Sequence, residues 1–219
     1  YRGLTGLGDI TGDGVADFGI PVSRETFNRY YLFSGGAVMS SPVPTALPAS
    51  SALQRLLQPA GTVPSNSNGF GVAAVGGLNL IGGVGLELAV GHARANTVFL
   101  YTDGGASGFP NPPATIGGSG NFGNSLAVAD INLDGRWDLV IGTDRLDQGS
   151  PWVFYNTATG FDPLTGQFNQ ANLVGSGAKA LGVSVAVGDF NADGKPQIAA
   201  GHNAIIDALR RPGRVRLPR

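Results

Sequence analysis

The sequence contains no cysteine and only two histidines in 219 residues, and charged residues make up only 13% of it. The absence of cysteine excludes disulfide bonds and thiolate chemistry, and it is compatible with a protein outside the cell. No apolar run approaches the ~20 residues that a membrane-spanning helix needs. Disorder is also excluded, because 42% of the residues are hydrophobic and the formal net charge is only −1.

Glycine, in contrast, is abundant: it accounts for 36 of the 219 residues, about twice its usual share of roughly 7%. Many glycines and few charges are typical of short strands joined by tight turns. The length is sufficient for one or two domains with a real core. The first residue is Tyr1 rather than Met, so we expect a processed product or a piece of a longer protein.

Residues 130–138 carry oxygen-bearing side chains in a pattern that is typical of a cation-binding loop. Asp130, Asn132, Asp134 and Asp138 occupy positions one, three, five and nine, and Arg136 at position seven can offer its backbone carbonyl. Ca²⁺ is held by six to eight such oxygens at roughly 2.3–2.6 Å. The glycine at position six permits the positive φ that lets the chain double back.

Two further segments, residues 9–17 and 189–197, repeat this pattern. The first would bind a cation through Asp9, Thr11, Asp13, Asp17 and the carbonyl of Val15. The second would use Asp189, Asn191, Asp193, Gln197 and the carbonyl of Lys195. Eight of the 15 acidic residues are aspartates of these three loops, so bound cations would neutralise much of the negative charge.

Solvated Asp/Asn/Gly turns are the alternative interpretation, and three copies at the same place in a repeat argue against it. An EF-hand would need a bidentate Glu at position twelve and flanking helices. Position twelve is Ile141 and Ala200 in two copies, and the flanks are strand-like. Mg²⁺ prefers to keep its waters, so Ca²⁺ is favoured. From the charge of the ligands we predict two to three ions, with affinity falling from the Asp130 loop to the Asp9 loop to the Asp189 loop.

The loops recur within a longer internal repeat, because Asp130 and Asp189 lie 59 residues apart and their surroundings match. Each unit contains an apolar strand, the loop, a second apolar strand, a turn and an aromatic third strand, and a weaker segment such as residues 168–174 closes it. We delimit four units at about residues 1–60, 61–117, 118–176 and 177–219, within one domain or propeller segment of residues 1–219. The second unit is degenerate, since its loop, residues 77–86, has lost the aspartates.

The first two strands of each unit are apolar almost throughout, which indicates sheets covered on both faces. We therefore predict an all-β fold of propeller blades, each with four antiparallel strands, in a partial or small ring. Residues 50–58, with leucines at helical spacing, are the one segment in which we expect a short helix.

The segments Phe70-Gly71, Phe122-Gly123 and Leu181-Gly182, together with the loops from Asp130 and Asp189, resemble FG-GAP repeats. Such repeats form the blades of integrin α-subunit propellers and of related bacterial and fungal propellers. The resemblance implies Ca²⁺ in the loops and blades arranged in a ring, usually of seven. The "GAP" part departs from the family, since those positions read Gly91-His92-Ala93, Gly142-Thr143-Asp144 and Gly201-His202-Asn203.

Enzymatic chemistry is not indicated by the sequence. His92 and His202 occupy equivalent places in two units, as do Ser125 and Ser184, so repeat structure explains them better than a catalytic site does. Paired carboxylates occur only within the loops, and no phosphate-binding glycine motif leads from a strand into a helix.

The last ten residues contain five arginines. Without aromatic interleaving they favour a charged edge strand or an acidic partner chain over nucleic acid.

These patterns predict a non-catalytic, calcium-binding module at the cell surface or outside the cell, which works in binding, adhesion or assembly. Its ligand would be a protein or a glycan, and a partner chain or self-association would cover the open ends of the blades. The alternatives are a lectin-like propeller, using Trp137, Trp152, Tyr101 and Tyr155 as stacking faces, and a hydrolase on a propeller scaffold. The aromatic residues would otherwise fill the core between blades.

Overall fold

The computed structural model describes residues 4–22, 29–39, 48–58, 69–78, 86–109, 113–144, 151–157, 160–161 and 181–202. These residues form antiparallel sheets with little helix, which confirms the predicted fold class. Within the described ranges, no helix is long and apolar enough to cross a membrane.

Two complete four-stranded sheets form the first half of the chain, and each follows the chain order of its strands. The first contains β1 (Thr5–Gly8), β2 (Asp17–Val22), β3 (Arg29–Phe33) and β4 (Gln54–Leu57). The second contains β5 (Phe70–Leu78), β6 (Leu86–His92), β7 (Thr97–Gly104) and β8 (Ala114–Gly117). The short helical turns nearby are α1 (Gly35–Val38), η1 (Ala49–Ser51) and η2 (Ala93–Ala95).

The second half repeats the inner part of this arrangement. A three-stranded sheet contains β9 (Ser125–Ala129), β10 (Asp138–Gly142) and β11 (Trp152–Phe154). A small hairpin of β12 (Asn156–Thr157) and β13 (Gly160–Phe161) follows it. The last described pair is β14 (Leu181–Gly188) and β15 (Gln197–His202). Residues 168–174, where a closing segment was predicted, lie outside the described residues.

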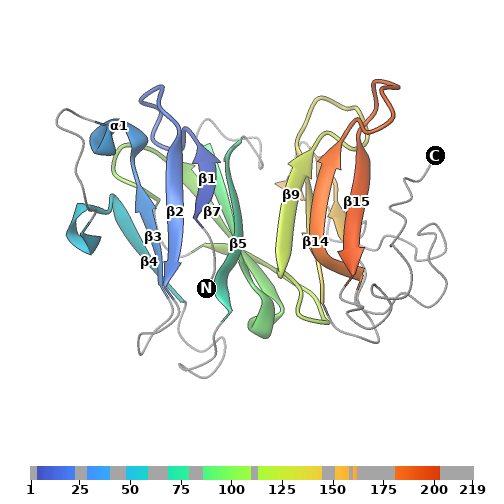
Figure 1. Ribbon diagram of the computed structural model, residues 1–219, viewed down its shortest axis with the longest axis horizontal. Coiled ribbons are helices and arrows are strands. Elements are labelled where there is room, and N and C mark those ends of the chain that lie inside the picture. The colour runs from blue at the N-terminus through green and yellow to red at the C-terminus, as the bar shows by residue number, and fades with distance from the viewer. Residues whose placement is uncertain are drawn as a thin grey trace, which may run out of the picture.

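The sheets stack face to face as blades, with the first strands of successive units side by side (Figure 1). β5 packs against both β1 and β9, and β9 packs against β14. In Figure 1 the described blades form an open row from the β1–β4 sheet at one side to β14 and β15 at the other.

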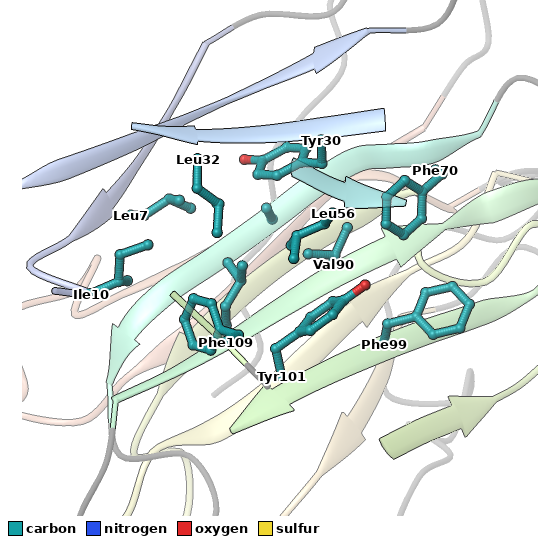
Figure 2. Close-up of a cluster of buried hydrophobic side chains, with 12 residues drawn as sticks. Leu7, Ile10, Tyr30, Leu32, Leu56, Phe70, Val90, Phe99, Tyr101 and Phe109 are labelled. Carbon is teal, nitrogen blue, oxygen red and sulfur yellow. The ribbon is translucent and has the colours of Figure 1, made fainter. Parts of the chain in front are cut away.

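Apolar side chains fill the space between each pair of neighbouring blades. Between the first two blades, Leu32 and Tyr30 from β3 face Phe99 and Tyr101 from β7 (Figure 2). A second cluster, which includes Leu139 and Phe122, joins the second blade to the third. A third cluster, with Val140 and Ile198 at its centre, joins the third blade to the last strand pair. Burial of both faces of a blade explains why its strands are apolar throughout.

Glycines that give the repeat its signature make the closest backbone contacts between blades. Gly123 and Gly182, each the second residue of a repeat's Phe-Gly or Leu-Gly pair, have φ values of +89° and +112°. A Cβ on Gly91 would overlap the backbone oxygen of Gly123, and a Cβ on Gly142 would overlap that of Gly182. The glycine at the end of one blade's second strand therefore lies against the turn glycine of the next blade. This contact leaves no room for a side chain on the strand glycine.

The predicted helix at residues 50–58 is wrong for most of its length. Only Ala49–Ser51 form a 3₁₀ turn, and Gln54–Leu57 form β4, which pairs with β3. Leu56 is fully buried between the first two blades. The side chain of Gln54 also exchanges hydrogen bonds with the backbone of Phe109, both at 2.7 Å. Completion of the sheet and this core contact outweigh the helical spacing of the leucines.

We expect Gly91→Ala to lower the free energy of unfolding by about 1–3 kcal/mol, because the new methyl group meets backbone that cannot rotate away. Gly117→Ala is the matched control, since a Cβ there meets nothing within 4 Å and the same sheet carries it. Urea unfolding monitored by circular dichroism measures both variants. Equal stability of the two would contradict the inferred close contact between blades.

Candidate metal-binding loops

The three predicted loops leave β1, β9 and β14 and return into β2, β10 and β15. They project from the same edge of the stacked sheets, at the top of Figure 1. Because each loop joins the first two strands of its blade, the repeat places three equivalent groups of oxygen atoms on one side of the molecule. Residues 79–85, most of the degenerate loop of the second unit, lie outside the described residues.

All three loops follow the same backbone path. The residues at positions four and six have positive φ in each copy. They are Gly12 and Gly14 in the Asp9 loop, Leu133 and Gly135 in the Asp130 loop, and Ala192 and Gly194 in the Asp189 loop. The glycine at position six is apparent from the sequence, whereas the left-handed conformation at position four is not, because leucine and alanine occupy it in two copies. A non-glycine residue in this conformation costs roughly 1–2 kcal/mol. Hydrogen bonds within the loop offset that cost.

In the Asp130 loop, the oxygens of positions one and three gather around one backbone N–H. The N–H of Asp134 donates to Asp130 Oδ1 at 2.9 Å and to Asn132 Oδ1 at 3.1 Å. The other oxygen of Asp130 accepts the N–H of Gly135 at 2.8 Å. The amide of Asn132 reaches Asp134 Oδ2 at 3.1 Å. Hydrogen bonds thus join position five to both position one and position three.

The Asp9 loop has the same arrangement with more carboxylate contacts to backbone. Asp9 accepts the N–H groups of Gly12, Asp13 and Gly14 at 2.7–3.1 Å. The bond from Gly14 is the main cause of a lowered pKa for Asp9. Asp13 Oδ2 additionally accepts the hydroxyl of Ser34 at 3.1 Å. Ser34 is a member of the site that sequence reasoning missed, because it lies outside the repeated pattern.

The aspartate at position nine anchors each of these two loops to its blade. Asp138 Oδ2 accepts the N–H of Ile131 at 2.8 Å, and Asp138 Oδ1 accepts the N–H of Asn156 at 2.8 Å. In the first blade, Asp17 accepts the N–H groups of Ile10 and Gly35, both at 2.8 Å. Both carboxylates are buried. Burial raises the pKa of Asp138, and the N–H donors oppose that rise.

The backbone N–H of position seven donates within each loop, whereas the predicted role of its carbonyl as a metal ligand stays a prediction. The N–H groups of Val15, Arg136 and Lys195 each donate to the Oδ1 atom of the aspartate two residues before them, at 2.8–2.9 Å. The guanidinium of Arg136 also lies 3.7 Å from Asp134 Oδ2. This exposed ion pair adds a positive charge beside the Asp130 loop that the Asp9 loop lacks.

The Asp9 and Asp130 loops fit a calcium ion through a mixed set of donors. Across the described ranges, no three His, Cys, Asp or Glu side chains gather closely enough to hold a metal by themselves. The hydroxyl, amide and backbone carbonyl oxygens of the loops would add to one half-buried, one exposed and one buried aspartate in each loop. Such a set of oxygens, wrapped by a short loop with glycine at position six, is what Ca²⁺ binding requires.

The Asp189 loop shares the path but differs at position nine. Asp193 N–H donates to Asp189 Oδ1 at 3.0 Å and to Asn191 Oδ1 at 3.2 Å, as in the Asp130 loop. The Asn191 amide, at 2.9 Å from Asp193 Oδ2, is the main cause of a lowered pKa for Asp193. Gln197, however, brings an amide rather than a carboxylate into the loop.

Residues considered for catalysis have structural surroundings. His92 Nδ1 accepts the N–H of Ala95 at 3.3 Å, so it ends β6 by capping η2. Its ring is fully buried beside Phe70 and Phe99. The hydroxyl of Ser125 donates to the carbonyl of Gly182 at 2.9 Å and so joins two blades. Ser184 is exposed, and the side chain of His202 lies outside the described residues.

Three of the four aromatic residues considered for sugar stacking contribute to the cores between blades. Tyr101 is buried in the first cluster, and Trp152 and Tyr155 pack against the second and third. Trp152 also stacks on Phe154. Trp137 is 42% exposed, on the Asp130 loop.

Comparison with known proteins agrees with this architecture. A sequence profile of the FG-GAP-like repeat matches residues 132–200, which include most of two loops. These two loops and the strands around them are FG-GAP repeats.

Integrin α chains are among the most similar proteins. Integrin alpha-7 from Homo sapiens is 33% identical over 193 residues, which cover 80% of this chain and 16% of the integrin. Integrin alpha pat-2 from Caenorhabditis briggsae is 38% identical over 112 residues, 48% of this chain and 9% of that protein. The Mus musculus phosphatidylinositol-glycan-specific phospholipase D is 31% identical over 84 residues, 35% of this chain and 10% of the enzyme. The resemblance to FG-GAP repeats of the integrin α type is thereby confirmed, and the chain spans about a sixth of the length of human integrin alpha-7.

The burial of His92 predicts that the stability of the protein depends on pH. Burial lowers the pKa of His92 to about 4, against about 6.5 in an unfolded chain. His92 in the unfolded state therefore takes up a proton as the pH falls below about 6.5. In the folded state it takes up this proton only when the pH reaches about 4. Stability that is fully present at pH 7.5 should fall by up to about 2 kcal/mol by pH 5.

His92→Asn keeps an acceptor for the cap of η2 and removes the titration. Urea unfolding of both proteins at pH 7.5 and pH 5, in chelator, measures the difference. The wild type should lose up to about 2 kcal/mol more than the variant over this interval. An equal loss would show that His92 does not contribute to the pH dependence.

Proposed function

We propose that the chain is a calcium-binding FG-GAP module that acts without catalysis, in the binding, adhesion or assembly of an extracellular or cell-surface protein. The observation that carries this proposal is the repetition of one loop conformation, with oxygen-bearing side chains at equivalent positions, on one edge of the stacked blades. Three such loops join the first two strands of the first, third and fourth units, and a divalent cation would cross-link the donors that a loop brings together. The four repeats at about residues 1–60, 61–117, 118–176 and 177–219 would together form this single module.

The site residues of the proposal are the oxygen donors of the loops. We assign the highest affinity to Asp130, Asn132, Asp134 and Asp138 with the carbonyl of Arg136, followed by Asp9, Thr11, Asp13 and Asp17 with the carbonyl of Val15. Each of these loops carries three carboxylates, and the affinity of a calcium loop rises with ligand charge. The Asp9 loop comes second because Thr11 is a shorter and weaker ligand than Asn132.

The proposal of adhesion and of an extracellular location is supported by the similarity to integrin α chains. That similarity extends over 80% of this chain but over only 16% of human integrin alpha-7, so the role of the whole relative is extended to this chain as a proposal. The local similarity to a phospholipase covers 35% of the chain. A hydrolase is less well supported, because His92 is buried among aromatic rings and caps a helical turn.

A partner is proposed for the face of the last strand pair. At position two of the Asp9 and Asp130 loops, Ile10 and Ile131 pack in the cores formed with the following blade. Phe190 is the third residue of this kind, and it is 48% exposed. Ser184 and Ala186 on β14 are exposed as well. A partner chain or a second copy would cover this face, while a glycan ligand would have Trp137 as its exposed aromatic contact.

Asp134→Ala should reduce the stabilisation of the protein by calcium. At a calcium concentration 100 times Kd, one site contributes about 2.7 kcal/mol, which corresponds to about 5–10 °C in Tm for a chain of this size. Scanning calorimetry in calcium and in chelator measures the response. Leu133→Ala is the control, since it changes the same exposed loop without removing an oxygen, and it should keep the full response. A calcium response of Asp134→Ala equal to that of the wild type would count against the proposal.

Phe190→Ser should leave the fold and the calcium response intact and weaken self-association or partner binding at this face. Light scattering coupled to size-exclusion chromatography reports the mass at increasing concentration. Thr115→Ser, at an exposed position on β8, is the control. A wild type that stays monomeric at every concentration would leave a separate partner chain as the occupant, and a complex unaffected by Phe190→Ser would refute this face as the contact.

A further inference from the structure

Gln197 occupies position nine of the Asp189 loop, and its amide group contacts positions two, three, five and seven of that loop. Its Oε1 accepts the N–H of Phe190 at 2.7 Å. Its Nε2 lies 3.0 Å from Asn191 Oδ1, 3.2 Å from Asp193 Oδ1 and 2.8 Å from the carbonyl oxygen of Lys195. These three oxygens belong to positions three, five and seven, the positions whose oxygens would face a cation. Gln197 itself is only 7% exposed.

The corresponding aspartates of the other loops make the first of these contacts, with the N–H of position two, but they have no NH₂ group that could contact the loop oxygens. Asp17 and Asp138 accept the backbone N–H of position two through one oxygen, as Gln197 does. Their second oxygen is an acceptor too, so a carboxylate can hold the backbone and still present a lone pair to a cation. The Gln197 amide has one acceptor and one donor group. Because the acceptor is used by Phe190, the group that faces the loop oxygens is an NH₂ donor.

Reversal of the amide does not recover a calcium site at low cost. With Oε1 turned toward the oxygens of positions three, five and seven, the NH₂ group would face the N–H of Phe190, donor against donor. A buried donor without an acceptor costs about 1–3 kcal/mol. The loop also has two carboxylates rather than three, with Lys195 at position seven, so the electrostatic attraction for Ca²⁺ is weaker than in the other loops.

We propose that the Gln197 side chain replaces the cation in the Asp189 loop, so that this loop is closed by an internal amide and the described part of the chain binds calcium at two loops instead of three. This inference rests on the proposed function for the Asp9 and Asp130 loops. It differs from the sequence-based expectation that Gln197 is a weak calcium ligand. The amide hydrogens satisfy three of the oxygens that a cation would bind, and the loop keeps its shape at any calcium concentration.

Native mass spectrometry and isothermal titration calorimetry count the calcium ions bound to each variant. The wild type should bind two, and Gln197→Asp should bind three, because it restores the carboxylate of the other loops. Gln197→Asn is the matched control: it has the length of aspartate and keeps the amide, and it should bind two. Asp189→Ala should leave the wild-type count unchanged, whereas Asp130→Ala should reduce it to one.

Three ions on the wild type, with one lost in Asp189→Ala, would overturn the inference. So would a count of two for Gln197→Asp. The failure of the proposed function gives a different result, namely a wild type without bound calcium. In that case Gln197→Asp still decides the inference, because one ion gained by this variant alone supports it and no gain contradicts it.

Discussion

The structure depends on the hydrogen bonds that the side chain at position nine of each loop accepts from its own backbone. Asp17, Asp138 and Gln197 all accept the N–H of position two. In the first and third blades the same carboxylate also accepts an N–H from the chain that follows the third strand, at Gly35 and Asn156. One buried side chain thus fixes the loop relative to its sheet, and the oxygens of positions one, three and five are then brought together by the turn. Calcium would add to an arrangement that the backbone has already formed, which is why a residue with an amide can complete it instead.

The blades place these loops on a common edge because two kinds of contact hold each sheet against the next. Apolar clusters fill the interior between blades, and glycine pairs such as Gly91 with Gly123 allow backbones to touch. The signature glycines of the repeat are therefore contacts between units. These contacts explain why the strands and glycines keep the same spacing from one unit to the next, even in the second unit, which has lost its aspartates. A unit can lose the aspartates of its loop and still stack, provided that its strands and its glycines remain.

Much of this was predictable from the amino-acid sequence, since a period of 59 residues and apolar strands with Asp/Asn/Gly loops define blades. Three features were not. Leu133 and Ala192 have the left-handed conformation, although neither residue type favours it. Residues 54–57 form an outer strand because pairing with β3 and burial of Leu56 outweigh leucine spacing that suits a helix. From the sequence, Gln197 is predicted to be a neutral ligand. Only the positions of its Oε1 and Nε2 atoms in the loop show that the NH₂ group, a hydrogen-bond donor, faces the other oxygens.

Terbium luminescence tests the central claim most directly, because Tb³⁺ binds calcium loops and emits when a nearby tryptophan absorbs light. Trp137 is exposed at position eight of the Asp130 loop, so a cation held there would lie close to its indole ring. The account predicts saturable emission upon excitation of tryptophan, which calcium displaces and which Asp130→Ala abolishes while the fold is retained. Emission that never exceeds that of free Tb³⁺, or that persists in Asp130→Ala, would contradict it.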